Sequence, residues 1–278
     1  MIRPRVAVIA AAGFGGRMMP VTKSISKEML PVGNRPIVDY AVENAVKAGV
    51  EKIIFITRED DDQLRSFYSK PKQALVDGLA SIGKTNIIPD IEYLHTLAEF
   101  VFVDQPHDGR YGTGLLPVIA QQALESEELF WLLAGDNAAF RPDGRELELL
   151  LQTLNEHDMH SAIACTEVPL QNVGRYGVIE YQDSNDHKIF NRIVEKPAPD
   201  QAPSNLINIS SYLFHADIID ICKTIEITDN EYLLTDAFEE YSKRHPMLTW
   251  PITGSFIDVG NPKAFAEANQ LVINTIRG

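Results

Sequence analysis

The chain has 278 residues, with 39 acidic and 25 basic side chains and a formal net charge of −14. An acidic excess of this size argues against general binding to nucleic acid or to an anionic membrane. No apolar run approaches the roughly 20 residues that cross a bilayer. The two cysteines, Cys165 and Cys222, lie far apart in apolar stretches without the spacing of a metal site. We therefore expect a cytoplasmic protein with free, buried thiols.

The N-terminal segment has the pattern of a parallel α/β fold. Residues 6–10 form a short run with β-branched side chains, which indicates a buried strand and not a signal peptide, because a charged segment follows directly. After Pro36, residues 37–46 have apolar positions at helical spacing, and residues 52–57 form a second apolar run. Strand, helix and strand in this order predict a right-handed crossover.

The alternation continues to the C-terminus. The charged segment 60–86 predicts helical excursions outside the sheet. Further strands are expected at residues 100–103, 130–134, 161–168, 176–181, 189–195 and 207–214, with a turn at 183–186 between the fourth and fifth of these. Helices are expected at residues 116–124, 146–157, 216–223, 232–242 and 265–276. We expect one α/β domain over residues 1–278, in which the second half covers the carboxyl edge of the sheet.

A glycine-rich loop follows the first strand. Residues 11–17 read Ala-Ala-Gly-Phe-Gly-Gly-Arg, and no acidic side chain occurs in residues 1–27. Glycines let the backbone approach a phosphate closely, and Arg17 and Lys27 can neutralise its charge. The spacing fits neither the dinucleotide-binding fingerprint nor the phosphate loop that ends in Gly-Lys-Ser/Thr. A turn that serves topology alone is the alternative.

Polar residues follow the strand expected at 130–134. Asp136 and Asn137 come at its carboxyl end, where ligands of open α/β sheets bind. Asp136 could instead cap a following helix. Glu195 and Lys196 lie between an expected strand and Pro197. They form either one edge of the site or a charge pair exposed to solvent.

These motifs resemble those of bacterial UTP–glucose-1-phosphate uridylyltransferases. The shared opening is Ala-Ala-Gly-x-Gly-x-Arg from residue 11, Pro-x-Thr-Lys from 20, Lys-Glu-Met-Leu-Pro from 27 and Pro-Ile-Val-Asp-Tyr from 36. The likeness continues in Gly135-Asp136-Asn137, Arg175-Tyr176-Gly177-Val178, Val194-Glu195-Lys196-Pro197, residues 202–206, Leu234-Thr235-Asp236-Ala237 and Ile257-Asp258-Val259-Gly260. The resemblance implies a single Rossmann-like nucleotidyltransferase domain with a mixed, mainly parallel sheet flanked by helices.

The same resemblance implies a reaction and a site. Glucose 1-phosphate would attack the α-phosphorus of UTP, or of dTTP, and pyrophosphate would leave. The implied nucleotide-binding residues are Ala11, Ala12, Gly13, Gly15, Gly16, Gln105 and Gly112, with the backbone at 11–13 holding the base and Gln105 reading it. Arg17 and Lys27 would bind the triphosphate and, with Lys196, act in catalysis.

Metal and sugar ligands are implied in the same way. Asp136 and Asp258 would hold one Mg²⁺, which prefers hard carboxylate and phosphate oxygens. Gly177, Glu195 and Asn208 would line the sugar, and Lys196 would bind its phosphate. The family also implies a homodimer or homotetramer. Phe14, Met18 and Tyr111 could touch the base, but packing is the commoner role of such residues beside a strand.

Four departures from the family pattern concern selectivity. Gly16 stands where relatives usually have Ser or Thr, Ser210 replaces a Gly, and Asn137 stands where many have Asp. Residues 110–114, Arg-Tyr-Gly-Thr-Gly, replace Gly-Leu-Gly-His-Ala and retain only the central glycine. The Gly135-Asp136-Asn137 motif and the Gly112-Thr113 pair are closer to glucose-1-phosphate thymidylyltransferases. The preference between UTP and dTTP or another nucleoside triphosphate therefore stays open, as does the choice of sugar 1-phosphate. A weakly active regulatory homologue is a further alternative. The glycine spacing disfavours an NAD-dependent dehydrogenase.

Overall fold

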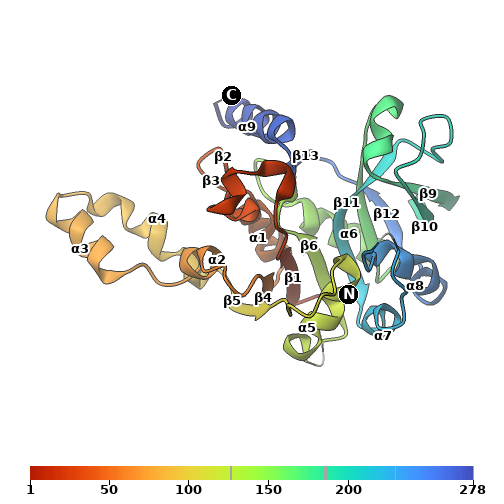
Figure 1. Cartoon of the computed structure of the whole chain (residues 1–278), viewed down its shortest axis with the longest axis horizontal. Coiled ribbons are helices and arrows are strands. Elements are labelled where there is room, and N and C mark those ends of the chain that lie inside the picture. Colours follow the sequence, from red (N-terminus) through yellow and green to blue (C-terminus); the bar gives the residue numbers. More distant parts are fainter. Residues whose placement is uncertain (126, 185–186, 229, 278) are drawn as a thin grey trace.

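The computed structural model describes residues 1–125, 127–184, 187–228 and 230–277, and a nine-stranded sheet extends across them (Figure 1). Its order is β5 (Glu99–Asp104), β4 (Lys52–Thr57), β1 (Val6–Ala11), β6 (Leu129–Ala134), β11 (Leu206–His215), β8 (Ala162–Glu167), β12 (Leu248–Pro251), β10 (His187–Glu195) and β9 (Gly177–Ser184). Strands β5, β4, β1 and β6 are parallel neighbours, whereas β11 and β10 run against the strands beside them. The predicted mixed central sheet is confirmed, and its parallel pairings lie mostly in the N-terminal half, between β5, β4, β1 and β6.

Helices cover both faces of this sheet. Alternate residues of a strand point to opposite faces, so Ala7 and Ile9 of β1 pack under α1 (Ile37–Lys47) and α6 (Glu146–Glu156). Val6 and Val8 point the other way and join the apolar core formed with the other helices, α5 (Leu116–Leu124), α7 (Ile218–Cys222) and α8 (Phe238–Arg244). Because both faces are buried, the strands read as continuous apolar runs.

Two small sheets lie beside the large one. β7 (Asn137–Phe140) pairs antiparallel with β13 (Ser255–Asp258), and β2 (Pro31–Val32) pairs with β3 (Arg35–Pro36). The last helix, α9 (Pro262–Arg277), packs against β13 and β2. None of these four strands was anticipated, and β12 was also missed. Since Asp136 is followed by a strand, it does not cap a helix.

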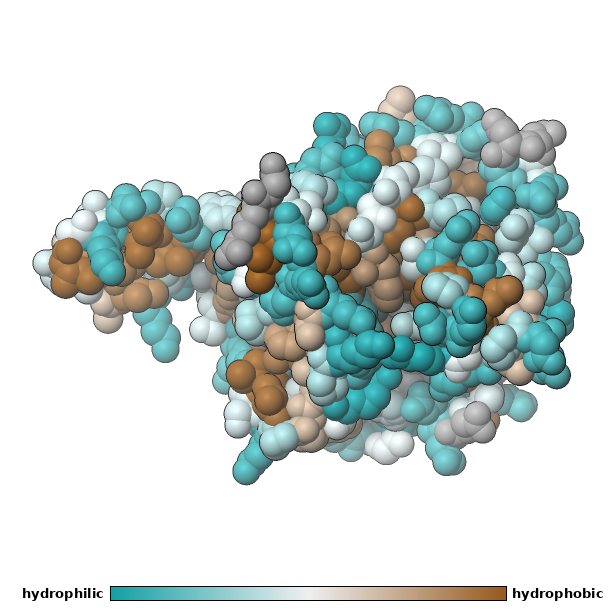
Figure 2. Space-filling view, turned by 90° about the horizontal axis from the view of Figure 1, so that it is seen from above, coloured by the Kyte–Doolittle hydropathy of each residue, from teal (hydrophilic) through white to brown (hydrophobic). Residues whose placement is uncertain are grey.

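The charged segment after β4 projects from the body as an arm, as expected (Figure 1). It contains α2 (Gln63–Phe67), α3 (Gln73–Ser81) and α4 (Pro89–Glu92). No described residue of α3 or α4 is buried, and hydrophobic residues gather on the arm's surface (Figure 2). The exposed large apolar side chains there are Leu75, Ile82, Ile87 and Tyr93.

Several expected boundaries shift. The helix expected at 232–242 is a short 3₁₀ turn, Leu234–Ala237, continued by α8, and the helix at 216–223 is only α7. In the expected turn at 183–186, residues 183–184 belong to β9, and residues 185–186 lie outside the described residues. Cys165 and Cys222 are free and buried, as expected. In the part of the chain that the structure describes, every helix is too short or too polar to cross a membrane.

Candidate active site

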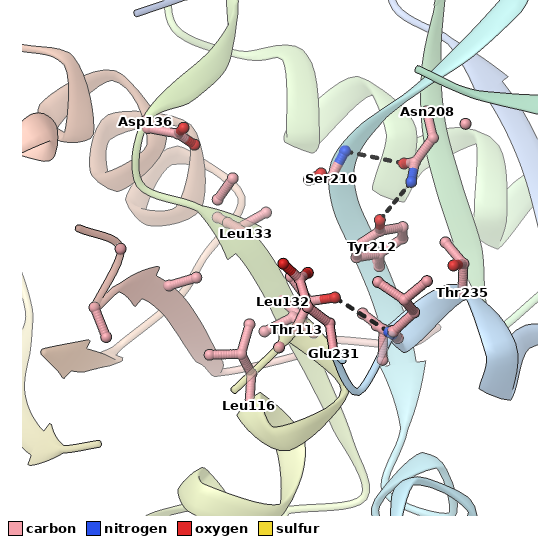
Figure 3. A pocket seen from close by; sticks show the side chains of 18 of the residues that line it. Thr113, Leu116, Leu132, Leu133, Asp136, Asn208, Ser210, Tyr212, Glu231 and Thr235 are labelled. Carbon is pink, nitrogen blue, oxygen red and sulfur yellow. Dashed lines mark hydrogen bonds between the residues drawn. The ribbon is translucent and has the colours of Figure 1, made fainter. Parts of the chain in front are cut away.

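A cavity of about 390 Å³ opens where β1, β5 and β6 end, and β11 forms its far wall (Figure 3). Loops from both halves of the chain therefore meet at this edge of the sheet, as ligand sites of open α/β folds do. The cavity is lined by nine of the residues proposed from sequence: Ala12, Gly13, Lys27, Gln105, Gly112, Asp136, Gly177, Glu195 and Asn208.

The glycine-rich loop has two kinds of glycine. Gly15 has a φ of +63°, and a Cβ there would lie 2.8 Å from Cγ2 of Thr22, so the loop requires glycine at this position. Gly16 has open space around it. Ala11 is buried inside β1 and does not line the cavity. The loop after it is held by Arg58, whose Nη1 donates a hydrogen bond to the Gly13 carbonyl (3.1 Å).

Lys27 and Asp136 form an ion pair at the cavity wall. Lys27 Nζ lies 2.6 Å from Asp136 Oδ2, and both side chains are largely shielded from solvent. Burial alone would lower the pKa of Lys27, but the carboxylates of Asp136 and Glu28 outweigh it and raise that pKa. Lys27 is therefore a permanent cation that faces the space above β6.

Asp258 is brought to Asp136 by the pairing of β13 with β7. Val259 N donates to the Asp136 carbonyl (3.1 Å), and Gly260 N donates to Asp258 Oδ1 (2.8 Å). Burial and the neighbouring Asp136 raise the pKa of Asp258. A Cβ on Gly260 would lie 3.2 Å from Arg17 Nη2, so Arg17 reaches the same place. Two close carboxylates that repel each other fit a hard divalent cation such as Mg²⁺.

Glu28 is a cavity residue to which the sequence interpretation gave no role. It is 2% exposed, and burial raises its pKa to about 7. Within the described residues its buried Oε2 has no hydrogen-bond partner, and neither does Oδ1 of Asn137 beside Asp136. Buried oxygens without partners are costly and mark places where a ligand can bind.

The opposite wall holds the residues proposed for the sugar. Gly177 pairs with Glu195 across β9 and β10, and a Cβ at Gly177 would lie 3.0 Å from Glu195 Oε1. Thr235 Oγ1 donates to that oxygen (3.3 Å). Asn208 is oriented at both ends, because its Nδ2 donates to Tyr212 Oη (2.7 Å) and its Oδ1 accepts from Ser210 N (2.9 Å) (Figure 3).

Lys196 stands apart from the other proposed residues. Its backbone has a φ of +45° and donates to the Tyr176 carbonyl (3.0 Å), while its side chain is exposed and does not line the cavity. Arg175 does line the cavity, although the sequence indicates no role for it beyond its place in the motif of residues 175–178. The cavity thus has a second cation beside Gly177 that sequence reasoning did not single out.

The loop after β5 lines one side of the cavity with residues that include Gln105 and Gly112. Gln105 N donates to Thr57 O (2.8 Å), which fixes the start of the loop. Gly112 has a φ of +130°, and a Cβ there would lie 2.3 Å from the Tyr232 carbonyl oxygen. Met18 is buried, as its packing role predicts, but Phe14 and Tyr111 are exposed and their rings face each other with centroids 6.4 Å apart.

The fold and this cavity are those of a ligand-binding α/β protein, with Lys27 and Asp136 beside the carboxyl ends of parallel strands and Asp258 close by. A family model described as nucleotidyl transferase matches residues 6–275. A UTP–glucose-1-phosphate uridylyltransferase of Staphylococcus epidermidis is 32% identical over 269 residues, covering 96% of this chain and 91% of the relative. Its Bacillus subtilis counterpart YngB is 30% identical over 261 residues, covering 92% and 85%.

Solved structures agree. A UDP-glucose pyrophosphorylase complexed with UDP-glucose superimposes with a TM-score of 0.82 at 29% identity, covering 98% of this chain and 99% of that one. The chain belongs to the nucleotidyl transferase family. The resemblance seen in the motifs and the prediction of a transferase enzyme are confirmed, and the dehydrogenase alternative is excluded.

Proposed function

We propose that this enzyme makes UDP-glucose and pyrophosphate from UTP and glucose 1-phosphate, with Mg²⁺. The observation that carries the proposal is the ion pair of Lys27 and Asp136 at the cavity wall, with Asp258 close behind Asp136. The curated relatives are named for this reaction. A cavity of about 390 Å³ falls in the range of small-ligand sites.

The nucleotide side of the cavity would hold the triphosphate. The loop at Ala12 and Gly13 offers backbone groups to the base, with Gln105 beside it. Lys27 and Arg17 balance the negative charge of the phosphates, which is what phosphoryl transfer mainly needs from a protein. Mg²⁺ held by Asp136 and Asp258 would screen the charge on the phosphate oxygens when bound.

The sugar side would position the attacking phosphate. Asn208 and Glu195 have hydrogen-bonding atoms directed by Tyr212, Ser210 and Thr235 and can orient sugar hydroxyls. Arg175 and Lys196 are the nearby cations for the sugar phosphate. One phosphate oxygen of glucose 1-phosphate forms a bond to the α-phosphorus, the bond from that phosphorus to the β-phosphate oxygen breaks, and pyrophosphate leaves. Holding the two anions in line supplies much of the rate enhancement.

Pyrophosphate release with a panel of nucleotides and sugar phosphates tests the proposal. We expect release with UTP, glucose 1-phosphate and Mg²⁺, and none when Mg²⁺ is chelated. No release with any pair would reject nucleotidyl transfer, and release with only another pair would reject the named substrates.

dTTP is the second candidate nucleotide. Residues 110–114 depart from the uridylyltransferase pattern, and Thr113 and Gly112 line the cavity. Direct competition between UTP and dTTP for the enzyme would decide between them. A higher kcat/KM with dTTP would replace UTP in the proposal.

We also propose a cytoplasmic homodimer or homotetramer. The arm carries apolar side chains at Leu75, Ile82 and Tyr93 that the described residues leave exposed, and such surfaces are often covered in assemblies. Light scattering at assay concentration tests the assembly, and a monomeric mass would contradict it.

A further inference from the structure

A cluster of two histidines and a carboxylate lies at the other end of the sheet. His215 is the last residue of β11, Asp217 follows it, and His245 directly follows α8. His215 pairs with Leu129, the first residue of β6, whereas Asp136 comes after the last. At about 3.3 Å per strand residue, the cluster is roughly 20 Å from Asp136 and roughly 10 Å from Tyr212, which lines the cavity from β11. His215, Asp217 and His245 do not line the cavity, so the proposed transfer reaction does not account for the cluster.

The polar atoms of the three side chains lie close together. His245 Nε2 lies 2.9 Å from Asp217 Oδ2, and His215 Nδ1 lies 3.2 Å from Asp217 Oδ1. One ligand atom from each residue falls within 4.8 Å of the others. The histidines are about one-quarter exposed and Asp217 about one-half exposed, with side-chain values of 24%, 22% and 48%. The cluster is therefore shielded, but an ion can reach it from solvent.

The surrounding residues hold the histidines in place. The His245 ring stacks between His215, at 4.5 Å between centroids, and Tyr241, at 5.1 Å. Tyr241 is fully buried, and its hydroxyl accepts a hydrogen bond from His215 N (2.7 Å) and contacts Ser161 Oγ (2.7 Å). One buried tyrosine thus fixes the backbone of one histidine and the ring of the other. Fixed ligands lose little entropy on binding.

A carboxylate also faces the outer nitrogen of His215. Glu128 Oε1 lies 3.5 Å from Nε2 on the side away from Asp217. A proton on Nε2 leaves the Nδ1 lone pair directed at the cluster, which is the orientation that carboxylates give to metal-binding histidines. Nδ1 at present accepts a hydrogen bond from Asp217 N (3.2 Å), and an ion would exchange this contact for a stronger one.

We propose that His215, Asp217 and His245 form a binding site for a divalent transition-metal ion of the Zn²⁺ class. Two imidazole nitrogens and one carboxylate oxygen are ligands for Zn²⁺, Co²⁺ or Ni²⁺, whereas Mg²⁺ prefers oxygen alone. Water completes the coordination. The two stacked rings are 14° from parallel, and the lone pairs of their nitrogens lie in the ring planes, so seating the ion requires the rings to rotate out of this stack about the broad terminal torsion of each histidine.

The ion would fasten the helices on this face to the sheet. α7 begins directly after Asp217 and α8 ends directly before His245, and the two helices lie side by side (Figure 1). Both cover the core face that includes Phe214 and Phe238. The site therefore stabilises the fold and takes no part in nucleotidyl transfer. Its affinity for the ion falls as the pH is lowered, because protons compete for the same nitrogens.

Titration of the EDTA-treated full-length protein with Zn²⁺ tests the site. At pH 7.5 we expect one ion per chain by calorimetry and a visible spectrum of tetrahedral type with Co²⁺. At an ion concentration about 100 times Kd, the melting temperature rises by roughly 5 °C. His245→Asn and Asp217→Asn should each weaken binding by at least about tenfold.

A second histidine pair supplies the matched control. The rings of His157 and His187 are also 4.5 Å apart, and the double variant His157→Asn/His187→Asn should bind Zn²⁺ as the parent does. Thermal unfolding in EDTA shows which variants fold. If His245→Asn does not fold, the Zn²⁺ affinity of Asp217→Asn decides the test. Absence of Zn²⁺ binding in the parent overturns the proposal and leaves the cluster as contacts between Asp217 and the two histidines. Unchanged binding in the cluster variants also overturns it.

Discussion

The ammonium of Lys27 lies 2.6 Å from the carboxylate of Asp136, immediately after the central strand β6. This pair joins two segments far apart in the chain, since Lys27 follows the glycine-rich loop and Asp136 ends a strand of the sheet. Asp258 lies close enough to raise the pKa of Lys27 as well. When Asp136 is neutralised, Lys27 therefore still has a negative charge nearby.

Asp136→Asn should lower turnover by at least about 100-fold with little loss of stability, because this carboxylate is proposed to hold the metal and supports electrostatics more than packing. Steady-state pyrophosphate release and thermal unfolding measure the two effects. Asp183→Asn is the control, because its side chain is 79% exposed, and it should leave both turnover and stability unchanged. Near-normal turnover of Asp136→Asn would contradict the metal role.

Gly16→Thr should improve triphosphate binding. The position has open space, and a hydroxyl there can donate a hydrogen bond to a charged phosphate. Such a bond is worth about 1.5 kcal/mol or more, which is roughly a tenfold lower KM for the nucleotide. Gly15→Ala is the contrasting variant, because its φ is +63° and its Cβ would meet Thr22, so it should lose stability. An unchanged KM in Gly16→Thr would remove Gly16 from the proposed phosphate site.

Glu28 should make stability depend on pH. Its pKa in the folded chain is about 7, raised by burial from the ordinary 4.5. Between these values the folded chain holds a proton that the unfolded chain has lost, so the contribution of Glu28 to stability is present below pH 4.5 and is lost as pH rises through 7. The Glu28→Gln variant lacks this loss, and its stability relative to the parent should grow with pH by a few kcal/mol.

Denaturant unfolding in EDTA from pH 4.5 to 8 measures this difference. Glu59→Gln, at a side chain that is 75% exposed, is the control. A difference between parent and Glu28→Gln that is constant over the whole range would show that Glu28 titrates normally.

Ser210→Gly should stabilise the protein. Ser210 has a φ of +54°, a conformation that costs a residue with a Cβ about 1–2 kcal/mol and costs glycine little. The melting temperature should rise by roughly 2–4 °C per kcal/mol, with the Asn208 contact retained because it uses the backbone N–H. Ser211→Gly, one residue along and 8% exposed, should destabilise instead. A lower melting temperature for Ser210→Gly would mean that its hydroxyl contributes more than the strain costs.

Gly112→Ala should disrupt the loop over the nucleotide side. Its Cβ would lie 2.3 Å from the Tyr232 carbonyl oxygen, and backbone cannot move aside cheaply. Gly109→Ala is the matched control, because Gly109 also has a positive φ, of +85°, but open space around it. Activity should fall by at least tenfold only in Gly112→Ala, corresponding to roughly 1.4 kcal/mol. Equal effects of the two variants would assign the loss to backbone strain alone.

The sequence could predict the large sheet because its central strands are continuous apolar runs such as Lys52–Thr57, and both faces of the sheet are covered. The four-residue strand β13 contains Ser255 and Asp258 and has no such run, so its pairing with β7 could not be read. The family motifs identify Asp258 as a proposed metal ligand, but only the fold shows how Asp258 comes to lie beside Asp136.

Glu28 shows the same limit of prediction from the sequence. Its chemistry depends on burial against Gly135, whose absent Cβ would lie 3.0 Å from Glu28 Cγ. That contact joins residues more than one hundred positions apart, and no local pattern announces it. Lys196 shows the converse, since a motif placed it in the site while its side chain lies outside the cavity wall.

The pairing of β7 with β13 also has a consequence for the order of folding. All nine strands of the large sheet lie within residues 6–251, whereas β13 begins at Ser255. The large sheet can therefore form from residues that do not include Asp258. A molecule in which β13 has not yet paired with β7 would have its main core packed and would still lack one of the two carboxylates proposed to hold the metal.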